Sequence, residues 1–170
     1  KGADQFLPVF LQDDTLAERA SQIHGDLYAE FKRTAHPLPG AKELLAHLAG
    51  RGLSLWMASS AKPDEVNEFL SRLEAEDKVA GMVSKEDVAS TKPAPDLVAQ
   101  ALDKAGCRPD EAVFVGDTIW DIEAAQKVGL RTIAVLTGGA YCGDELKQAG
   151  AIGVYQDCAD LLRSGFLDSA

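Results

Sequence analysis

The sequence contains no long apolar run, no strongly basic stretch and few cysteines, and each absence excludes a class of protein. No apolar run approaches the roughly 20 residues that a membrane-spanning helix needs. The first ten residues lack the charged and then apolar layout of a secretory signal peptide. A net charge of −10 repels nucleic-acid phosphates and anionic lipids. We therefore expect no membrane and no nucleic-acid partner.

Aromatic residues are scarce as well, at 6% of the sequence, although 46% of it is hydrophobic. We therefore expect a core built mainly from Leu, Val and Ala. The three cysteines, Cys107, Cys142 and Cys158, are odd in number and form no CxxC pair. They favour reduced thiols in a cytoplasmic protein over a disulfide framework or a zinc site. A length of 170 residues is typical of one domain, with or without a small insert.

The first part of the chain, residues 4–36, has the spacing of an amphipathic helical segment. Thr15 is the predicted N-cap of a helix that begins at Leu16, with Glu18 as its capping-box partner. The segment HPLPG (36–40) then combines two prolines with a glycine, which end a helix and turn the chain. We predict a domain boundary there, between residues 1–36 and 37–170.

Beyond this boundary, helical and strand patterns alternate. The predicted strands lack polar alternation, as is typical of strands buried on both faces, and cover residues 53–58, 79–84, 112–116, 131–138 and 151–155. The predicted helices cover residues 41–52, 63–75, 95–106, 121–129, 143–150 and 158–166. This order predicts an α/β fold with a Rossmann-like parallel sheet and helices on both faces. In such sheets, ligands bind at the carboxyl ends of the strands.

Two of these strand ends and one helix start carry polar groups. Ser59 and Ser60 follow the strand that ends at Ala58, where a hydroxyl and free N–H groups suit an anion. A serine N-cap for the helix at Pro63 is the alternative interpretation. Lys92 precedes a helix and could neutralise a phosphate, although a solvated loop lysine would have the same sequence.

The segment VFVGDTIWD places two carboxylates after the strand at 112–116. Asp117 leaves the strand, and Asp121 lies one helical turn later, so the two can face the same spot. Oxygen ligands of this kind suit Mg²⁺. The alternative is that Asp117 caps the helix and Asp121 adds charge to its first turn. Together with Ser59 and Lys92, however, the pair forms one coherent site for a phosphate beside Mg²⁺.

These motifs resemble those of the haloacid dehalogenase superfamily of hydrolases, and phosphoglycolate-phosphatase-like enzymes in particular. LWMASSAK resembles the second motif, STKPAPD the third and VFVGDTIWDIEAAQKVG the fourth. The resemblance implies phosphate binding by Ser59, Ser60 and Lys92, with Lys92 and Ser59 acting in catalysis. It also implies Mg²⁺ binding by Asp117, with Asp121 as a second acidic partner that either supports the metal or orients Lys92. Residues 1–36 resemble the later helices of the family's helical cap.

The family's first motif, a strand ending in Asp-x-Asp-Gly-Thr that supplies the nucleophile, has no good copy here. VFLQDDTL (9–16) imitates it but places Leu11 at the nucleophile, and Pro8 interrupts any strand. We interpret it as a cap loop before a helix, and we expect the chain to begin within a longer protein. The missing strand would lie between those ending at Ala58 and Gly116. Without it, these two strands would be separated by roughly 9–10 Å. We therefore expect a poorly stable chain, or a sheet closed by rearrangement.

The implied activity of the parent protein is hydrolysis of a small phosphorylated metabolite through an aspartyl-phosphate, with Mg²⁺ as cofactor. The chain alone is then expected to be inactive, and a monomer or weak dimer. Two alternatives stay open: a phosphomutase of the same superfamily, and a catalytically dead member that acts as a binding protein. The nucleotide sequence upstream of Lys1 distinguishes an enzyme from the catalytically dead protein, because an in-frame first motif favours the enzyme.

Overall fold

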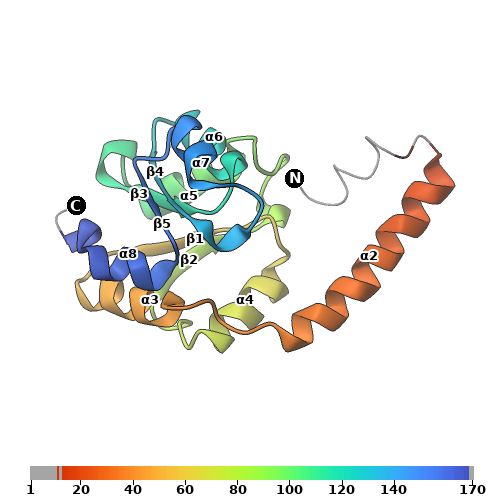
Figure 1. The fold of residues 1–170 in the computed structure, drawn as a ribbon, viewed down its shortest axis with the longest axis horizontal. Coiled ribbons are helices and arrows are strands. Elements are labelled where there is room, and N and C mark those ends of the chain that lie inside the picture. The colour runs from red at the N-terminus through yellow and green to blue at the C-terminus, as the bar shows by residue number, and fades with distance from the viewer. Residues whose placement is uncertain (1–10, 12, 169–170) are drawn as a thin grey trace. The chain divides into compact units, whose positions relative to one another are not determined.

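The computed structural model describes Leu11 and residues 13–168 of the chain. The chain forms two units, residues 1–36 and residues 37–170, which divide inside the HPLPG segment. Helix α2 (Asp14–Thr34) belongs to the first unit (Figure 1). All other described helices and strands belong to the second. That the first unit is part of a cap stays a prediction.

Helix α2 begins at Asp14 because Asp13, and not Thr15, is its N-cap. The Asp13 carboxylate accepts a hydrogen bond of 3.0 Å from the backbone N–H of Leu16. Aspartate caps helices at least as well as threonine, and this cap places Thr15 inside the first turn. The predicted Thr15 capping box is therefore wrong. Of the imitation motif at 9–16, Val9, Phe10 and Gln12 lie outside the described residues.

The apolar stripe predicted for the first unit lies on α2 and is exposed. Ile23, Leu27 and Phe31 are 50%, 51% and 70% exposed, and no described residue of α2 is buried. In proteins, helices draw most of their stability from tertiary packing of such an apolar face. Throughout the described part of the chain, no helix has the length and apolar character needed to cross a membrane.

The second unit follows the predicted alternation closely. Its strands are β1 (Leu55–Ala58), β2 (Val79–Val83), β3 (Val113–Gly116), β4 (Arg131–Val135) and β5 (Gly153–Tyr155). Its α-helices are α3 (Ala41–Gly50), α4 (Pro63–Arg72), α5 (Asp96–Ala105), α6 (Ile119–Gln126), α7 (Gly143–Gln148) and α8 (Cys158–Ser164). Short 3-10 turns cover Lys85–Asp87, Pro109–Glu111, Leu136–Gly138 and Phe166–Asp168. All strand pairs are parallel, which confirms the predicted α/β class.

The strands form two sheets rather than one. β1 pairs with β2, and β3, β4 and β5 pair in that order. Among the described residues, one edge of β1 and one edge of β3 therefore carry no strand partner. The division falls between the two strands where the absent first-motif strand was expected. The alternative expectation, a sheet closed by rearrangement, is wrong for the described chain.

Helices cover both faces of these strands (Figure 1). Leu44 and Leu48 of α3 and Leu161 of α8 pack with Ile133 of β4 on one face. Ile122 of α6 and Leu146 of α7 pack with Ala134 on the other. Ile133 and Ala134 are adjacent and both fully buried; successive side chains of a strand point to opposite faces. The core is thus layered, which confirms helices on both faces.

The turn that opens the second unit docks on the start of α8. The carbonyl of Pro39 accepts a hydrogen bond of 3.2 Å from the backbone N–H of Ala159. Gly40 has a left-handed φ of 75°, and a Cβ there would overlap the backbone N and Cα of Ala159. Both its backbone conformation and the close approach of α8 therefore require a glycine.

This docking predicts a large loss of stability for Gly40→Ala. Gly52→Ala is a matched control, because Gly52 has a φ of 78° but a Cβ there would meet no atom within 4 Å. Both variants carry the left-handed strain of about 1–2 kcal/mol. Gly40→Ala should lose about 1–3 kcal/mol more from overpacking. Urea unfolding curves measure both losses, and equal losses would contradict the docking.

Candidate active site

Lys92 lies in the segment between β2 and α5, and its side chain is 19% exposed. Its ammonium donates a 2.7 Å hydrogen bond to Asp121 Oδ1 and a 3.3 Å hydrogen bond to the carbonyl of Ala58. It also lies 5.7 Å from the centre of the Phe114 ring, within range of a cation–π interaction. The alternative of a solvated loop lysine does not hold, because protein groups surround the charge.

Asp121 is buried, with 4% of its surface exposed. Its Oδ2 accepts hydrogen bonds from the Thr118 hydroxyl at 2.7 Å, the Thr118 N–H at 3.1 Å and the Asp117 N–H at 3.2 Å. Its Oδ1 accepts from Lys92. Both carboxylate oxygens are therefore already engaged by protein donors. Thr118 is the N-cap of α6, so the alternative in which Asp117 caps this helix does not hold.

Asp117 is the first residue after β3 and is half-buried. Burial raises the pKa of its carboxyl, and the Asp121 charge and a hydrogen bond with Asp121 raise it further, while Lys92 lowers it in part. For Asp121, burial also acts to raise the pKa. The Lys92 ammonium and the Thr118 hydroxyl outweigh that effect, so the pKa of Asp121 is lowered. The charged form of Asp121 is thus stabilised, and the charged form of Asp117 is not.

Ser59 and Ser60 lie in the turn between β1 and α4. The Ser59 N–H donates a 2.9 Å hydrogen bond to Val83 of β2, and its hydroxyl accepts one of 3.1 Å from the Ala61 N–H. The N-cap of α4 is Lys62, so the alternative in which Ser59 caps that helix does not hold. The backbone groups of neighbouring strand residues point to opposite edges, so the Ala58 carbonyl points away from β2.

The structure thus brings Lys92, Asp117 and Asp121 into one connected group of contacts. Lys92 joins the carbonyl of Ala58, at the edge of β1 that faces away from β2, to the first turn of α6, which follows β3. Ser59 is one residue from the carbonyl that Lys92 contacts. The ammonium therefore bridges the two sheets at the carboxyl ends of β1 and β3, the edge where α/β sheets bind ligands.

Several contributors to this site were not identified in the sequence. Thr118 holds Asp121, and the S/T-x-x-D/E spacing typical of capping boxes could have revealed it. Lys127, the C-cap of α6, donates a 2.7 Å hydrogen bond to the carbonyl of Pro93, which follows Lys92. A Cβ at Gly116 would lie 2.5 Å from Asp121 Cβ, and one at Gly138 would lie 2.7 Å from Asp117 Oδ2. No sequence pattern signals these close approaches.

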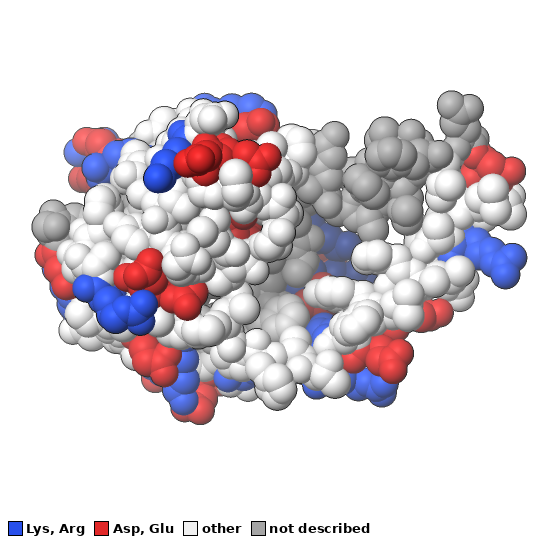
Figure 2. Space-filling model, viewed as in Figure 1, with Lys and Arg blue, Asp and Glu red and all other residues white. Residues whose placement is uncertain are grey.

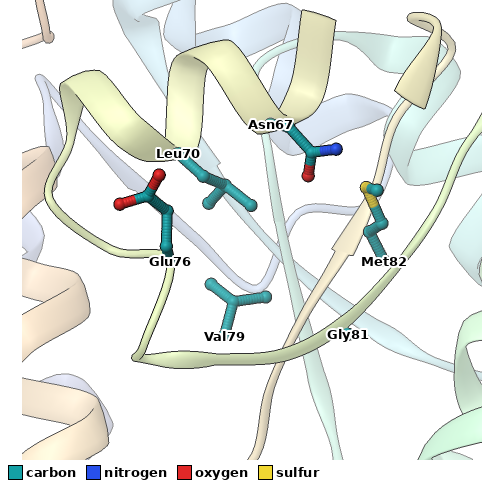
Figure 3. Close-up of a pocket in the computed structure, with 6 residues that line it drawn as sticks. All are labelled: Asn67, Leu70, Glu76, Val79, Gly81 and Met82. Atoms are coloured by element: carbon teal, nitrogen blue, oxygen red, sulfur yellow. The ribbon is translucent and has the colours of Figure 1, made fainter. Parts of the chain in front are cut away.

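A pocket of about 190 Å³ lies elsewhere, on the two-stranded sheet (Figure 3). It is lined by residues of α4, β2 and the segment that joins them: Asn67, Leu70, Glu76, Val79, Gly81 and Met82. None of the predicted site residues lines it. On the face drawn in Figure 2, acidic and basic side chains of the described residues are interspersed. Because the pocket contains no predicted site residue and the described residues of the drawn face form no patch of one charge, the Lys92 region is the candidate active site.

Comparison with known proteins agrees with this geometry. Residues 9–135 match the family of haloacid dehalogenase-like hydrolases. The chain belongs to this family. It is 30% identical over 123 residues to a phosphoglycolate phosphatase from Rhodospirillum rubrum, a match that covers 72% of this chain and 50% of that protein. It is 26% identical over 150 residues to a phosphorylated carbohydrates phosphatase from Thermotoga maritima, with 86% and 69% covered.

Solved structures of the haloacid dehalogenase-like fold are also similar. A hydrolase from Pseudomonas syringae superimposes with a TM-score of 0.81 at 37% identity, covering 92% of this chain and 71% of that one. A haloacid dehalogenase-like hydrolase from Streptococcus pneumoniae gives a TM-score of 0.80 at 19% identity, with 96% and 76% covered. The chain spans about half the length of the phosphoglycolate phosphatases from Rhodospirillum rubrum and Pseudomonas putida.

The opposite pKa directions of the acidic pair predict opposite effects of two amide substitutions. The raised pKa of Asp117 means that its ionisation disfavours folding as the pH rises through the folded-state pKa. At pH 7 in chelator, Asp117→Asn should therefore raise the Tm. This gain should vanish below the unfolded-state pKa of about 3.9, where the carboxyl is neutral in both states.

Asp121→Asn is the matched comparison and should lower the Tm at pH 7. The lowered pKa of Asp121 contributes stability that is present above about pH 3.9 and lost as the pH falls through the folded-state pKa. Differential scanning calorimetry across pH 3–8 measures both variants. A lower Tm for Asp117→Asn at pH 7 would contradict the conclusion that the ionised Asp117 carboxylate destabilises the fold.

Proposed function

We propose that this chain supplies most of the active site of a magnesium-dependent phosphatase that acts on small phosphomonoesters. The observation that carries the proposal is the Lys92 ammonium, held between Asp121 and Ala58 and next to the Asp117 carboxylate. A fixed, partly desolvated cation suits a transferring phosphoryl group, because preorganised charges act strongly where water is excluded. The names of the similar phosphatases support this class of substrate.

Asp117 is the proposed direct ligand of Mg²⁺. The described residues hold no cluster of three or more potential ligands, but Mg²⁺ is commonly bound by one or two carboxylates, waters and substrate phosphate oxygens. Asp117 fits this mode, since its carboxylate is partly desolvated without being stabilised by Lys92 to the extent that Asp121 is. When bound, the metal neutralises charge on the phosphoryl oxygens.

Of the two roles expected for Asp121, orienting Lys92 fits its contacts better than binding the metal directly beside Asp117. Its two oxygens already accept hydrogen bonds from Lys92, Thr118 and the Asp117 N–H. We therefore assign it to orienting Lys92 and the backbone of Asp117, as carboxylates in the outer shell of metal sites do. The Ser59 hydroxyl, the Ser60 N–H and Lys92 are the proposed contacts to the remaining phosphoryl oxygens.

The nucleophile is the part of the proposal that this chain does not supply. The family resemblance implies an aspartate at the end of a strand, and the division between β1 and β3 is where that strand would pair. An aspartyl-phosphate would form on that residue and then be hydrolysed. We therefore propose that the 170-residue chain alone does not hydrolyse phosphomonoesters. Residues 1–36 would contribute part of a cap that excludes water.

Hydrolysis of p-nitrophenyl phosphate tests this function in the protein encoded by the complete reading frame that contains this sequence. Activity should require Mg²⁺ and disappear in excess chelator. Asp117→Ala and Lys92→Met should each lower kcat by about 10²–10³-fold. Lys147→Met, on the exposed surface of α7, is the matched control and should retain full activity.

Two results would reject the proposal. One is full activity of the longer protein in chelator or after Asp117→Ala. The other is Mg²⁺-dependent turnover by the purified 170-residue chain, which would place the nucleophile among its own carboxylates. Tight binding of a phosphorylated metabolite without turnover by the longer protein would instead favour the catalytically dead binding protein.

A further inference from the structure

The segment that follows β4 lies directly against Asp117. β3 and β4 are neighbours, with Gly116 in register with Ala134. The 3-10 turn Leu136–Gly138 extends beyond the end of β4, and so it reaches the level of the first residue after β3. A Cβ added to Gly138 would lie 2.7 Å from Asp117 Oδ2, 2.9 Å from its Cγ and 3.1 Å from its backbone oxygen.

Comparison with the neighbouring Gly139 distinguishes two reasons for a glycine: too little space for a side chain, and a left-handed backbone. Gly139 has a left-handed φ of 66°, and a Cβ there would meet no atom within 4 Å. Gly138 is not among the glycines with a left-handed φ. The backbone conformation therefore explains the glycine at 139, while the close approach of Asp117 explains the one at 138.

The backbone of Asp117 has little freedom to move away from a side chain at position 138, so the carboxylate is the part that must shift. It follows β3 directly, and its backbone N–H is bonded to Asp121 Oδ2 at 3.2 Å. Asp121 is itself fixed by Lys92 and Thr118, and it lies so close to Gly116 that a Cβ there would overlap it. Added volume in a packed region is accommodated by strained side chains or by backbone shifts. Here both would displace the Asp117 carboxylate.

We propose that Gly138 is a positioning residue that sets the orientation of the Asp117 carboxylate for Mg²⁺. The proposal rests on the proposed function, in which Asp117 is the metal ligand. Gly138 contributes no ligand of its own and acts by the absence of a side chain. Its replacement by alanine should therefore weaken metal binding while leaving the fold intact.

The experiment compares Gly138→Ala, Gly139→Ala and Asp117→Ala in the protein from the complete reading frame. The rise in Tm on titration with MgCl₂ gives an apparent affinity that does not depend on activity. Gly138→Ala should weaken this affinity about 10–100-fold, the usual cost of disturbing the support of a metal ligand. Gly139→Ala should lower the Tm without metal but keep the wild-type affinity.

A second measurement does not involve metal. Asp117→Ala removes the Cγ and Oδ2 that a Cβ at position 138 would approach. The loss of Tm caused by Gly138→Ala in chelator should therefore be smaller in the Asp117→Ala background than in the wild type. An equal loss in both backgrounds would overturn the proposed contact, even if Gly138→Ala is too unstable for titration.

The outcomes separate the two proposals. If the wild type responds to MgCl₂ and Asp117→Ala does not, but Gly138→Ala matches Gly139→Ala, then only the role of Gly138 is overturned. If Asp117→Ala responds to MgCl₂ as the wild type does, then the metal ligand of the proposed function is wrong and the role of Gly138 falls with it.

Discussion

The Lys92–Asp121 ion pair joins two sheets that share no strand-to-strand hydrogen bonds among the described residues. Both side chains are largely buried, at 19% and 6% exposed. Removing one partner of a buried pair leaves an uncompensated charge, which costs about 3–5 kcal/mol in fully buried cases. The pair therefore constrains the fold at the same place where it forms the candidate site. Stability and the proposed chemistry therefore depend on the same few atoms.

Within that site, the acidic pair is asymmetric. Against the effect of burial, the Lys92 charge and hydrogen bonds from Lys92 and Thr118 lower the pKa of Asp121. Burial and the neighbouring Asp121 charge raise the pKa of Asp117. A protein can retain an unfavourable local arrangement of this kind when the surrounding structure fixes it. Functional sites often keep such destabilising groups because they bind a ligand. The Thr118 hydroxyl donates to Asp121, and Gly116 and Gly138 leave the space that the carboxylates of Asp121 and Asp117 occupy.

Helical spacing, short apolar runs and the glycines and prolines between them were enough to predict the order of helices and strands in residues 37–170. Their bounds were less predictable: the strand predicted over 131–138 ends at Val135, and a 3-10 turn covers Leu136–Gly138. Parallel pairing also followed, because alternating strands and helices leave few other arrangements. The start of α2 was less predictable: Asp13, Asp14 and Thr15 are all good caps, and only the folded backbone selects Asp13. For Asp117 and Asp121, a spacing of four residues predicted proximity but not which oxygens would be free. The contact of Gly138 with Asp117 joins distant segments, so no local pattern could reveal it.

The hydrogen bond from Ala159 to Pro39 has a consequence for the connection between the two units. From Pro39 onward the backbone is fastened to the start of α8, while α2 ends at Thr34. Any reorientation of the first unit must then be absorbed by the dihedral angles of residues 35–38. Pro37 fixes one of those angles and restricts the residue before it. The connection between the two units therefore has fewer accessible backbone conformations than a segment of the same length without proline would have.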